Sequence, residues 1–243
     1  MGYIGNPKTK GSGIICCIPQ TGICPRGCED CFFQSGRSFL EPLAENLPNM
    51  PSVEMTRGRV VRVNDGNDSS NQRELVIANT QDFEMKFYNT SSTEGIEDFD
   101  APVVLTVNPA GMTDDAYLIS PIPPNLMFVR VRTNTWNLNL VDEVVEYYSN
   151  YEVPIVLTFM AYFEAVMLDG HQNNYVFRQR TMNSYWAITT AAWAGIMFEY
   201  RHNKWVHSCG KIEGEKGTTA CRHCGNCLRE YFATMERLRD DCI

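Results

Sequence analysis

Three cysteines, Cys24, Cys28 and Cys31, stand four and three residues apart, shortly after an apolar run. A loop that follows a buried strand can bring three thiolates with this spacing around one centre. On a [4Fe–4S] cluster, three thiolates leave one iron open to a ligand that is not protein. Zinc is the alternative, because structural zinc sites close with a fourth ligand, for which Cys17 is the candidate.

A second group of cysteines lies near the end of the sequence. Cys221, Cys224 and Cys227 form two overlapping CxxC units, and Cys209 supplies a fourth thiol. Four thiolates hold either a closed [4Fe–4S] cluster, which transfers electrons or cross-links the chain, or a structural zinc ion. The sequence therefore predicts a closed metal site here and leaves the choice between cluster and zinc open.

The composition is that of an ordinary globular protein, with 243 residues of which 44% are apolar and 21% charged. The net charge of −8 argues against an extended nucleic-acid surface. No apolar run reaches the ~20 residues that a membrane span needs. Ten cysteines without a recognisable secretory leader indicate metal binding in the reducing cytoplasm. The alternative is a disulfide-bonded secreted protein.

Apolar runs alternate with helical patterns along the first two thirds of the chain. This order predicts βαβ units and an α/β fold, a partial (βα)6 parallel barrel over residues 1–168. A helical, cysteine-rich extension is expected over residues 169–243. The expected strands are Ile14–Ile18, Arg59–Asn64, Met85–Thr90, Ala101–Val107, Leu126–Thr133 and Val153–Met160. The expected helices are Phe39–Leu47, Asn71–Thr80 with Leu75, Val76 and Ala78 inward, Leu138–Asn150, Tyr175–Tyr200 and Leu228–Arg239.

Polar residues recur at alternate positions towards the ends of four of these strands. Because side chains alternate between the two faces of a strand, each set faces one side of the sheet. Polar groups at the carboxyl ends of barrel strands are typical of an active site. The sets are Arg62 and Asn64; Thr106 and Asn108; Arg130, Arg132 and Asn134; and Thr158, Met160 and Tyr162.

The cysteine loop and the strand order together resemble the radical S-adenosylmethionine enzymes. The resemblance covers residues 12–165 and rests on Cys24-x3-Cys28-x2-Cys31 after the first strand. It implies that these cysteines hold a [4Fe–4S] cluster whose open iron binds S-adenosylmethionine. In that family, reductive cleavage of the cofactor yields a 5′-deoxyadenosyl radical that abstracts hydrogen from the substrate. The C-terminal cysteines are similar to the auxiliary clusters of such enzymes.

The resemblance also suggests which residues bind the cofactor and the substrate. The family often has a Gly-Gly-Glu stretch after the second strand, which engages the amino group of the cofactor. Asn64, Asp65 and Asn67 take that place here and supply acceptor oxygens. Tyr162, as a donor of a hydrogen atom or proton, and Arg132, as a clamp for carboxylate or phosphate, are the predicted catalytic residues. Further cofactor contacts are expected from Thr106, Asn108 and Asn134.

The implied partners are a small-molecule, nucleotide or peptide substrate and an electron donor such as a reductase, flavodoxin or ferredoxin. Two other functions stay open on the sequence. In the first, both cysteine groups hold zinc and stabilise a binding protein without enzymatic activity. In the second, the clusters serve electron transfer alone.

Overall fold

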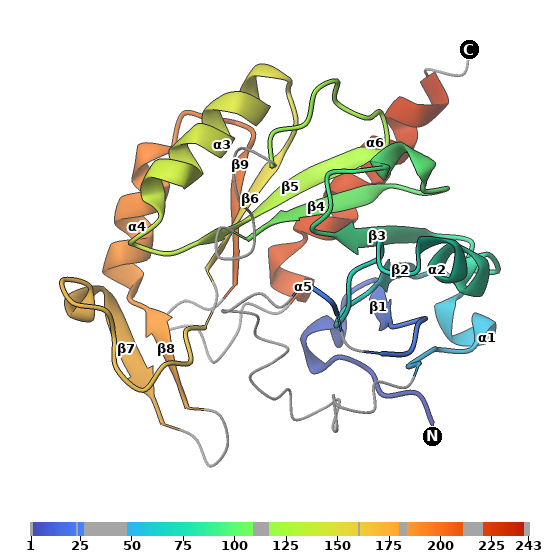
Figure 1. Cartoon of the computed structure of the whole chain (residues 1–243), viewed down its shortest axis with the longest axis horizontal. Helices are drawn as coiled ribbons and strands as arrows, with labels where there is room; N and C mark the ends of the chain where they lie inside the picture. Colours follow the sequence, from blue (N-terminus) through green and yellow to red (C-terminus); the bar gives the residue numbers. More distant parts are fainter. Residues whose placement is uncertain are drawn as a thin grey trace.

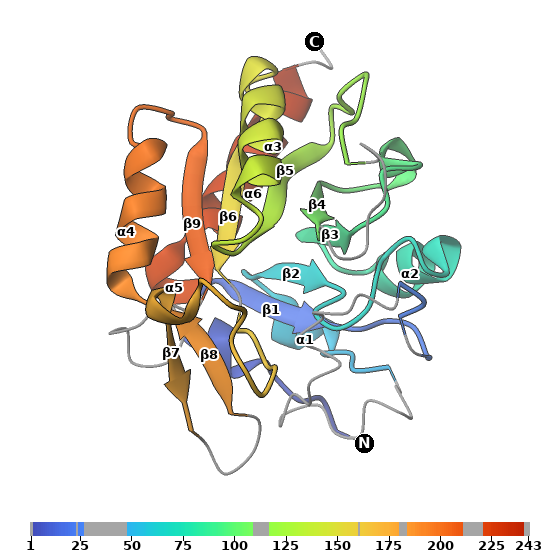
Figure 2. The same ribbon diagram turned by 60° about the vertical axis from the view of Figure 1, so that its left-hand side comes forward.

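Seven parallel strands form one curled sheet in the order β1-β2-β3-β4-β5-β6-β9 (Figure 1). The strand direction turns from β1 and β2 to β6 and β9, so the sheet is a half-barrel (Figure 2). The expected α/β class with a partial parallel barrel is therefore confirmed, with seven strands in place of six. The computed structural model describes residues 2–22, 24–26, 48–108, 117–159, 161–179, 184–210 and 221–240.

Each of the six expected strands is present, and no strand end differs from the expected one by more than two residues. The seventh strand, β9, was assigned to the cysteine-rich extension on the sequence. It pairs with β6 along its whole length, so the sheet continues beyond residue 168. The strands are β1 (Ile14–Cys17), β2 (Val60–Val63), β3 (Lys86–Thr90), β4 (Val103–Val107), β5 (Leu126–Thr133), β6 (Ile155–Phe159) and β9 (Val206–Gly210).

Helices cover both faces of the sheet. The side chains of α2 (Arg73–Thr80), α3 (Leu138–Asn150) and α4 (Thr190–Glu199) pack with one apolar cluster on the outer face. Helix α6 (Asn226–Asp240) packs through Tyr231 against a second cluster on the inner face. Because both faces are covered, the strands are nearly continuous apolar runs, as parallel sheets require. The shorter helices are α1 (Val53–Thr56), α5 (Cys221–Cys224), and the 3-10 turns η1 (Pro7–Thr9), η2 (Ile96–Asp98) and η4 (Gln172–Asn174).

The prediction of a helix over Tyr175–Tyr200 is wrong for its first half. Strands β7 (Tyr175–Arg178) and β8 (Tyr185–Ile188) form an antiparallel hairpin, and only α4 is helical. The aromatic and β-branched residues of this stretch favour strands. Backbone hydrogen bonds between Tyr162 and Trp186 join β8 to the chain that follows β6. The expected helix Phe39–Leu47 lies outside the described residues.

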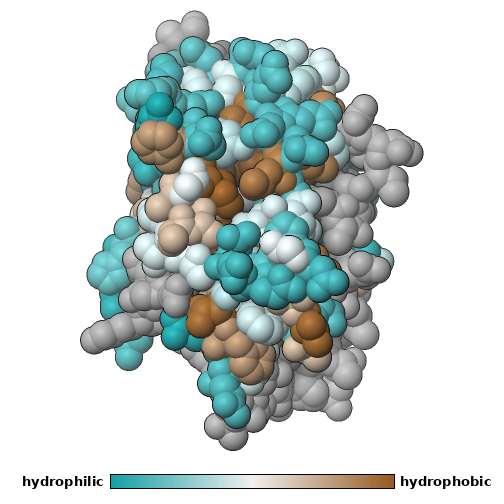
Figure 3. Space-filling model, turned by 90° about the vertical axis from the view of Figure 1, so that its left-hand side faces the viewer, coloured by the Kyte–Doolittle hydropathy of each residue, from teal (hydrophilic) through white to brown (hydrophobic). Residues whose placement is uncertain are grey.

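Apolar side chains are exposed on the face that carries α4 and the hairpin, where they interrupt a polar surface (Figure 3). Phe198 of α4 is 58% exposed, and Phe177 of β7 is 45% exposed. In the loop before β7, Val166 is 74% exposed. No helix in the described part of the chain is long and apolar enough to cross a membrane.

Helix α2 presents a different face to the core from the one expected. Val76 is fully buried, whereas Leu75 is 43% exposed and Ala78 is also exposed. The side chains that α2 buries are therefore Val76 and Thr80, which are one helical turn apart, and the larger Leu75 is not among them.

Adjacent substitutions in α2 test this orientation. We expect Val76→Ala to lower the free energy of unfolding by about 2 kcal/mol, through lost apolar burial and a residual cavity. Leu75→Ala is the matched control and should change it by less than about 0.5 kcal/mol. Chemical denaturation measures both variants, and a larger loss for Leu75→Ala would contradict the orientation.

Candidate cofactor and metal site

The first cysteine loop begins shortly after β1. Cys24 is half-buried, and the chain reaches it from Cys17 through the buried residues Pro19 and Gln20. Because β1 is parallel to β2, this loop leaves the same edge of the sheet as the loop that follows β2. Cys28 and Cys31 lie outside the described residues, so the convergence of the three thiols stays a prediction.

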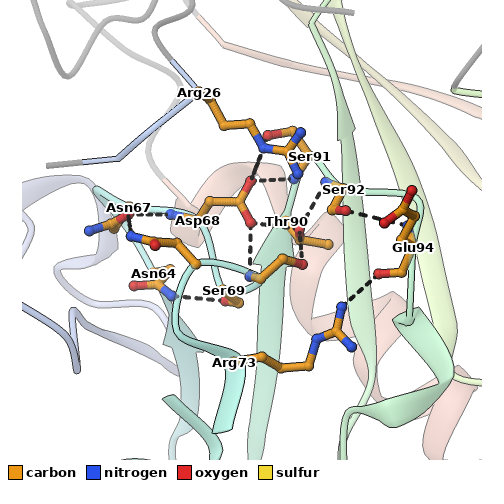
Figure 4. Close-up of polar contacts among 12 residues, drawn as sticks. Arg26, Asn64, Asn67, Asp68, Ser69, Arg73, Thr90, Ser91, Ser92 and Glu94 are labelled. Atoms are coloured by element: carbon orange, nitrogen blue, oxygen red, sulfur yellow. Dashed lines mark hydrogen bonds and ion pairs between the residues drawn. The ribbon is translucent and has the colours of Figure 1, made fainter. Parts of the chain in front are cut away.

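Asp68 is the polar centre of the loop after β2 (Figure 4). Its Oδ1 accepts hydrogen bonds from the Ser70 N–H at 2.9 Å and the Thr90 hydroxyl at 2.7 Å. Its Oδ2 accepts hydrogen bonds from the N–H and hydroxyl of Ser91, at 2.8 and 2.7 Å. Arg26 of the cysteine loop adds an ion pair, with its Nε 3.5 Å from Oδ2. The carboxylate therefore joins the ends of β2 and β3 to the cysteine loop.

The structure separates the roles of two predicted cofactor residues in this loop. Asn64 has a left-handed backbone, with φ 62°, and its Nδ2 donates to Ser69 Oγ at 2.9 Å. Its Oδ1 is buried and accepts no hydrogen bond from the described residues. Asn67 instead donates its side-chain N–H to the Gly22 carbonyl at 3.0 Å. Asn64 therefore has an acceptor to offer a ligand, whereas Asn67 holds the segment that leads to Cys24.

Asp65 is engaged by neighbouring side chains on the inner face of the sheet. Arg62 Nη2 donates to Asp65 Oδ1 at 2.8 Å, and the Asn6 amide donates to Oδ2. Burial lowers the pKa of Arg62, but the charges of Asp65 and the thiols of Cys16 and Cys221 outweigh it and leave the pKa raised. Arg62 thus stays a buried cation, and part of the capacity of Asp65 to accept from a cofactor is already used.

The polar ends of β4 and β5 lie on the inner face, as predicted. Val104 and Phe128 belong to the inner apolar cluster, so the alternate residues that follow them along the same strands face the same way. The buried Oδ1 of Asn108 accepts no hydrogen bond within the described ranges. The other predicted residues on these two strands are Thr106 (half-buried), Arg130 (half-buried), Arg132 (buried) and Asn134 (buried).

The turn from β5 into α3 is held by one asparagine side chain. Asn137 Oδ1 accepts a hydrogen bond from the backbone N–H of Asn134 at 2.8 Å. Its Nδ2 donates to the Arg132 carbonyl at 2.8 Å. The backbone on both sides of Thr133 is therefore fixed, and this positions the main chain from which the Arg132 and Asn134 side chains project.

Tyr162 does not continue the polar row of β6. The strand ends at Phe159, and Tyr162 packs with the outer apolar cluster. Its ring meets Trp136 edge-on, with 5.1 Å between ring centroids, and Trp136 also contacts His171 and Tyr175. Thr158 keeps the inward position on β6, and Met160 lies outside the described residues.

The cysteines of the second group lie on three elements. Cys209 lies in β9, Cys221 and Cys224 are the two ends of α5, and Cys227 is in the first turn of α6. The thiols of Cys209 and Cys224 interact and shift each other's pKa in opposite directions, and Cys224 Sγ donates to the Ser208 carbonyl at 4.0 Å. Among the described residues, no three His, Cys, Asp or Glu side chains are grouped as a metal site. The closed four-cysteine centre therefore stays a prediction.

Basic side chains lie beside these thiols. The hydrogen bond with Cys224 is the main cause that lowers the pKa of Cys209; it outweighs burial and is aided by the charges of Lys8, Arg130 and Arg62. The same bond raises the pKa of Cys224. The first thiol is thus stabilised as a thiolate, the form that binds metals.

Cys16 is buried in β1, as expected of a strand residue, and burial raises the pKa of its thiol. Its interactions with Asp65 and Cys221 were not predicted. The first follows from the pairing of β1 with β2, and the second depends on α5 packing beside the start of the chain, where the side chain of Arg222 lies close to Gly11. The spacing of residues in the sequence gives no indication that Cys16 and Cys221 lie close together.

Gly210 allows Cys209 to lie close to β6. Its φ is +114°, and a Cβ at this position would lie 2.1 Å from the Phe159 carbonyl oxygen. A side chain therefore conflicts with both the backbone conformation and the neighbouring strand.

No family model, curated protein or solved structure matches this chain.

The residues at the strand ends fit a bound polar ligand. Two buried acceptor oxygens, Asn64 Oδ1 and Asn108 Oδ1, receive no hydrogen bond within the described part of the chain. Buried acceptors of this kind are costly unless a partner satisfies them. The donor set of Cys24, Cys28 and Cys31 also fits an iron–sulfur cluster, because thiolates are its usual protein ligands.

Two glycine substitutions test how closely β9 approaches β6. We expect Gly210→Ala to lower the free energy of unfolding by more than about 1 kcal/mol, because it adds strain and a clash. Gly195→Ala is the control, since its Cβ would meet nothing within 4 Å, and it should stabilise the exposed helix α4 by about 0.5–1 kcal/mol. Thermal unfolding measures both, and a neutral Gly210→Ala would contradict the close approach.

Proposed function

We propose that this chain is an iron–sulfur enzyme of the radical S-adenosylmethionine type. The observation that carries the proposal is the meeting of two features at one edge of a curled parallel sheet. The loop that begins with Cys24 is anchored there by Asp68, and the unsatisfied oxygens of Asn64 and Asn108 lie at the ends of β2 and β4. Ligands of parallel α/β folds bind at this edge of the sheet.

Cys24, Cys28 and Cys31 are the proposed ligands of a [4Fe–4S] cluster with one open iron. When bound there, the cluster and S-adenosylmethionine supply a 5′-deoxyadenosyl radical for hydrogen abstraction. The protein contributes position and hydrogen bonds. It holds the start of the cysteine loop on Asp68 and offers acceptors from the strand ends beneath the loop.

Within this proposal, the acceptors for the cofactor's ammonium group are unequal. Asn64 Oδ1 is the first candidate, because it is buried and accepts no hydrogen bond from the described residues. Asp65 accepts hydrogen bonds from Arg62 and Asn6, and the Asn67 amide is bound to the Gly22 carbonyl. Asn108 Oδ1 is the second candidate, whereas Thr106 and Asn134 are proposed to line the remaining strand ends.

Arg132 is the proposed clamp for a carboxylate or phosphate of the substrate, because it is a buried cation on the inner face. Tyr162 is not retained as the donor of a hydrogen atom or proton, because it packs against Trp136 with the outer apolar cluster. The substrate class is a small molecule, nucleotide or peptide. A cytoplasmic reductase, flavodoxin or ferredoxin is the proposed electron donor.

The C-terminal cysteines are proposed to hold an auxiliary cluster. Zinc is the second candidate, because four thiolates drawn from β9, α5 and α6 could close a structural zinc site. A zinc ion at both cysteine groups would mean a metal-stabilised binding protein, and clusters without cofactor cleavage would mean an electron carrier.

Removal of one loop ligand tests the proposed function. After anaerobic reconstitution, we expect roughly eight iron and eight sulfide ions per chain if both groups hold cubes. Cys28→Ala should lose about half of each, because the loop site cannot close on two thiolates. It should also abolish formation of 5′-deoxyadenosine from S-adenosylmethionine under reducing conditions.

Cys242→Ala is the control, because this cysteine belongs to neither group and should leave both measurements unchanged. Cofactor cleavage retained in Cys28→Ala would contradict the proposal. So would a colourless protein with about two zinc ions per chain, the content expected of two closed structural sites.

A second test concerns Asn64. We expect Asn64→Gly, which tolerates the left-handed backbone, to weaken binding of S-adenosylmethionine to the reconstituted protein about tenfold, through loss of a charge-assisted hydrogen bond. Ser69→Ala removes the hydrogen-bond partner of Asn64 Nδ2 and keeps the Asn64 oxygen, so it should bind nearly as the wild type does. Equilibrium dialysis measures both, and equal affinities for Asn64→Gly and wild type would overturn this role.

A further inference from the structure

The segment that leads into the first cysteine loop is hydrogen-bonded to the β2–α2 loop and to helix α2. Gln20 Nε2 donates to the carbonyls of Asp68 and Asn71, at 2.9 and 3.1 Å. Asn79 Nδ2 donates to the Pro19 carbonyl at 2.9 Å. Together with the hydrogen bond from Asn67 to Gly22, these bonds attach residues 19–22 to the β2–α2 loop and to helix α2.

The ion pair between Arg26 and Asp68 extends this attachment into the cysteine loop itself. Arg26 stands two residues after Cys24 and two before Cys28. Its side chain is 35% exposed, whereas that of Asp68 is 4% exposed. The pair therefore links a loop residue to a buried group of the sheet, at the midpoint between two proposed cluster ligands.

Asp68 does not need Arg26 to satisfy its hydrogen bonding. Four donors from Ser70, Thr90 and Ser91 already occupy both carboxylate oxygens, and an ionised carboxylate accepts about four. These donors belong to the ends of β2 and β3, so they fix the carboxylate in place before the loop is added (Figure 4). The buried charge is thus a rigid docking point, and Arg26 is the adaptable partner.

We propose that Arg26 and Asp68 are positioning residues for the first cluster, and this inference rests on the proposed function. A loop that must bring three thiolates to one centre loses conformational entropy when it does so. An anchor between the first two ligands removes part of that loss before the cluster binds, which is the effect of preorganisation. The pair should therefore affect retention of the loop cluster more than the stability of the fold, because Arg26 is partly exposed.

Release of iron to a chelator under anaerobic conditions tests this inference on the full-length reconstituted chain. Cys28→Ala, loaded in the same way, gives the signal of the C-terminal site alone, which is subtracted. We expect Arg26→Gln and Asp68→Asn each to release the loop iron about tenfold faster, because each removes the charge pair. The double variant should be no faster than the faster single variant, and Arg26→Lys should restore most of the retention.

Arg73→Gln is the matched control, because Arg73 begins helix α2 just after the Asp68 loop, and its ion pair and hydrogen bonds are with Asp98 and Glu94. It should release iron at the wild-type rate. Wild-type release from Arg26→Gln, or a double variant whose acceleration equals the product of the two single effects, would overturn the pairing. If Asp68→Asn fails to fold, the Arg26 variants still decide the question.

Hydrogen exchange separates this inference from the proposed function. In the metal-free chain, Arg26→Gln should speed exchange in the peptide covering residues 19–26, and Arg73→Gln should not. If the loop takes up no iron but this difference appears, the proposed function fails and the attachment of the loop stands. Unchanged exchange in Arg26→Gln would overturn the attachment itself.

Discussion

Parallel pairing of the strands is the constraint on which the rest of the structure depends. Each strand from β1 to β6, and then β9, runs in the same direction, so their carboxyl ends meet at one edge. That edge receives the cysteine loop after β1, the Asp68 loop after β2 and the polar ends of β4 and β5. Residues that are far apart in the sequence are therefore neighbours because of the sheet alone.

The inner face of the sheet carries both cations and thiols. Arg62 and Cys16 are paired in register across β1 and β2, and Cys209 lies opposite Thr158 across β6 and β9. Four thiolates around a divalent core would keep a net negative charge, which the buried Arg62 would partly offset. The C-terminal cysteines thus meet an environment suited to an anionic metal centre, in a protein whose net charge is −8.

Elements with a strongly periodic sequence can be predicted with correct first and last residues. Leu126–Thr133 and Leu138–Asn150 agree with the structure, because a long apolar run and a clear helical stripe leave little choice. Tyr175–Arg178 was expected to be helical and is a strand, since short aromatic runs suit either structure. Val206–Gly210 was missed because only its pairing with β6 makes so polar a segment a strand.

The candidate site could be predicted in its residue types and less well in its contacts. The polar strand ends were found because alternation places them on one face. Arg26 and Asp68 were not found, since their meeting depends on how the loop after β1 lies over the loop after β2. Tyr162 was expected to follow β6 inward, but the chain turns after Phe159 and packs Tyr162 against Trp136.

Anomalous diffraction from crystals grown with S-adenosylmethionine tests the central claim most directly, because it identifies the metal and its ligands together. We expect a four-iron cluster bound by Cys24, Cys28 and Cys31, with one iron ligated by the cofactor at the ends of β2 and β4. A zinc ion in the loop, or a fourth protein ligand on that iron, would contradict it.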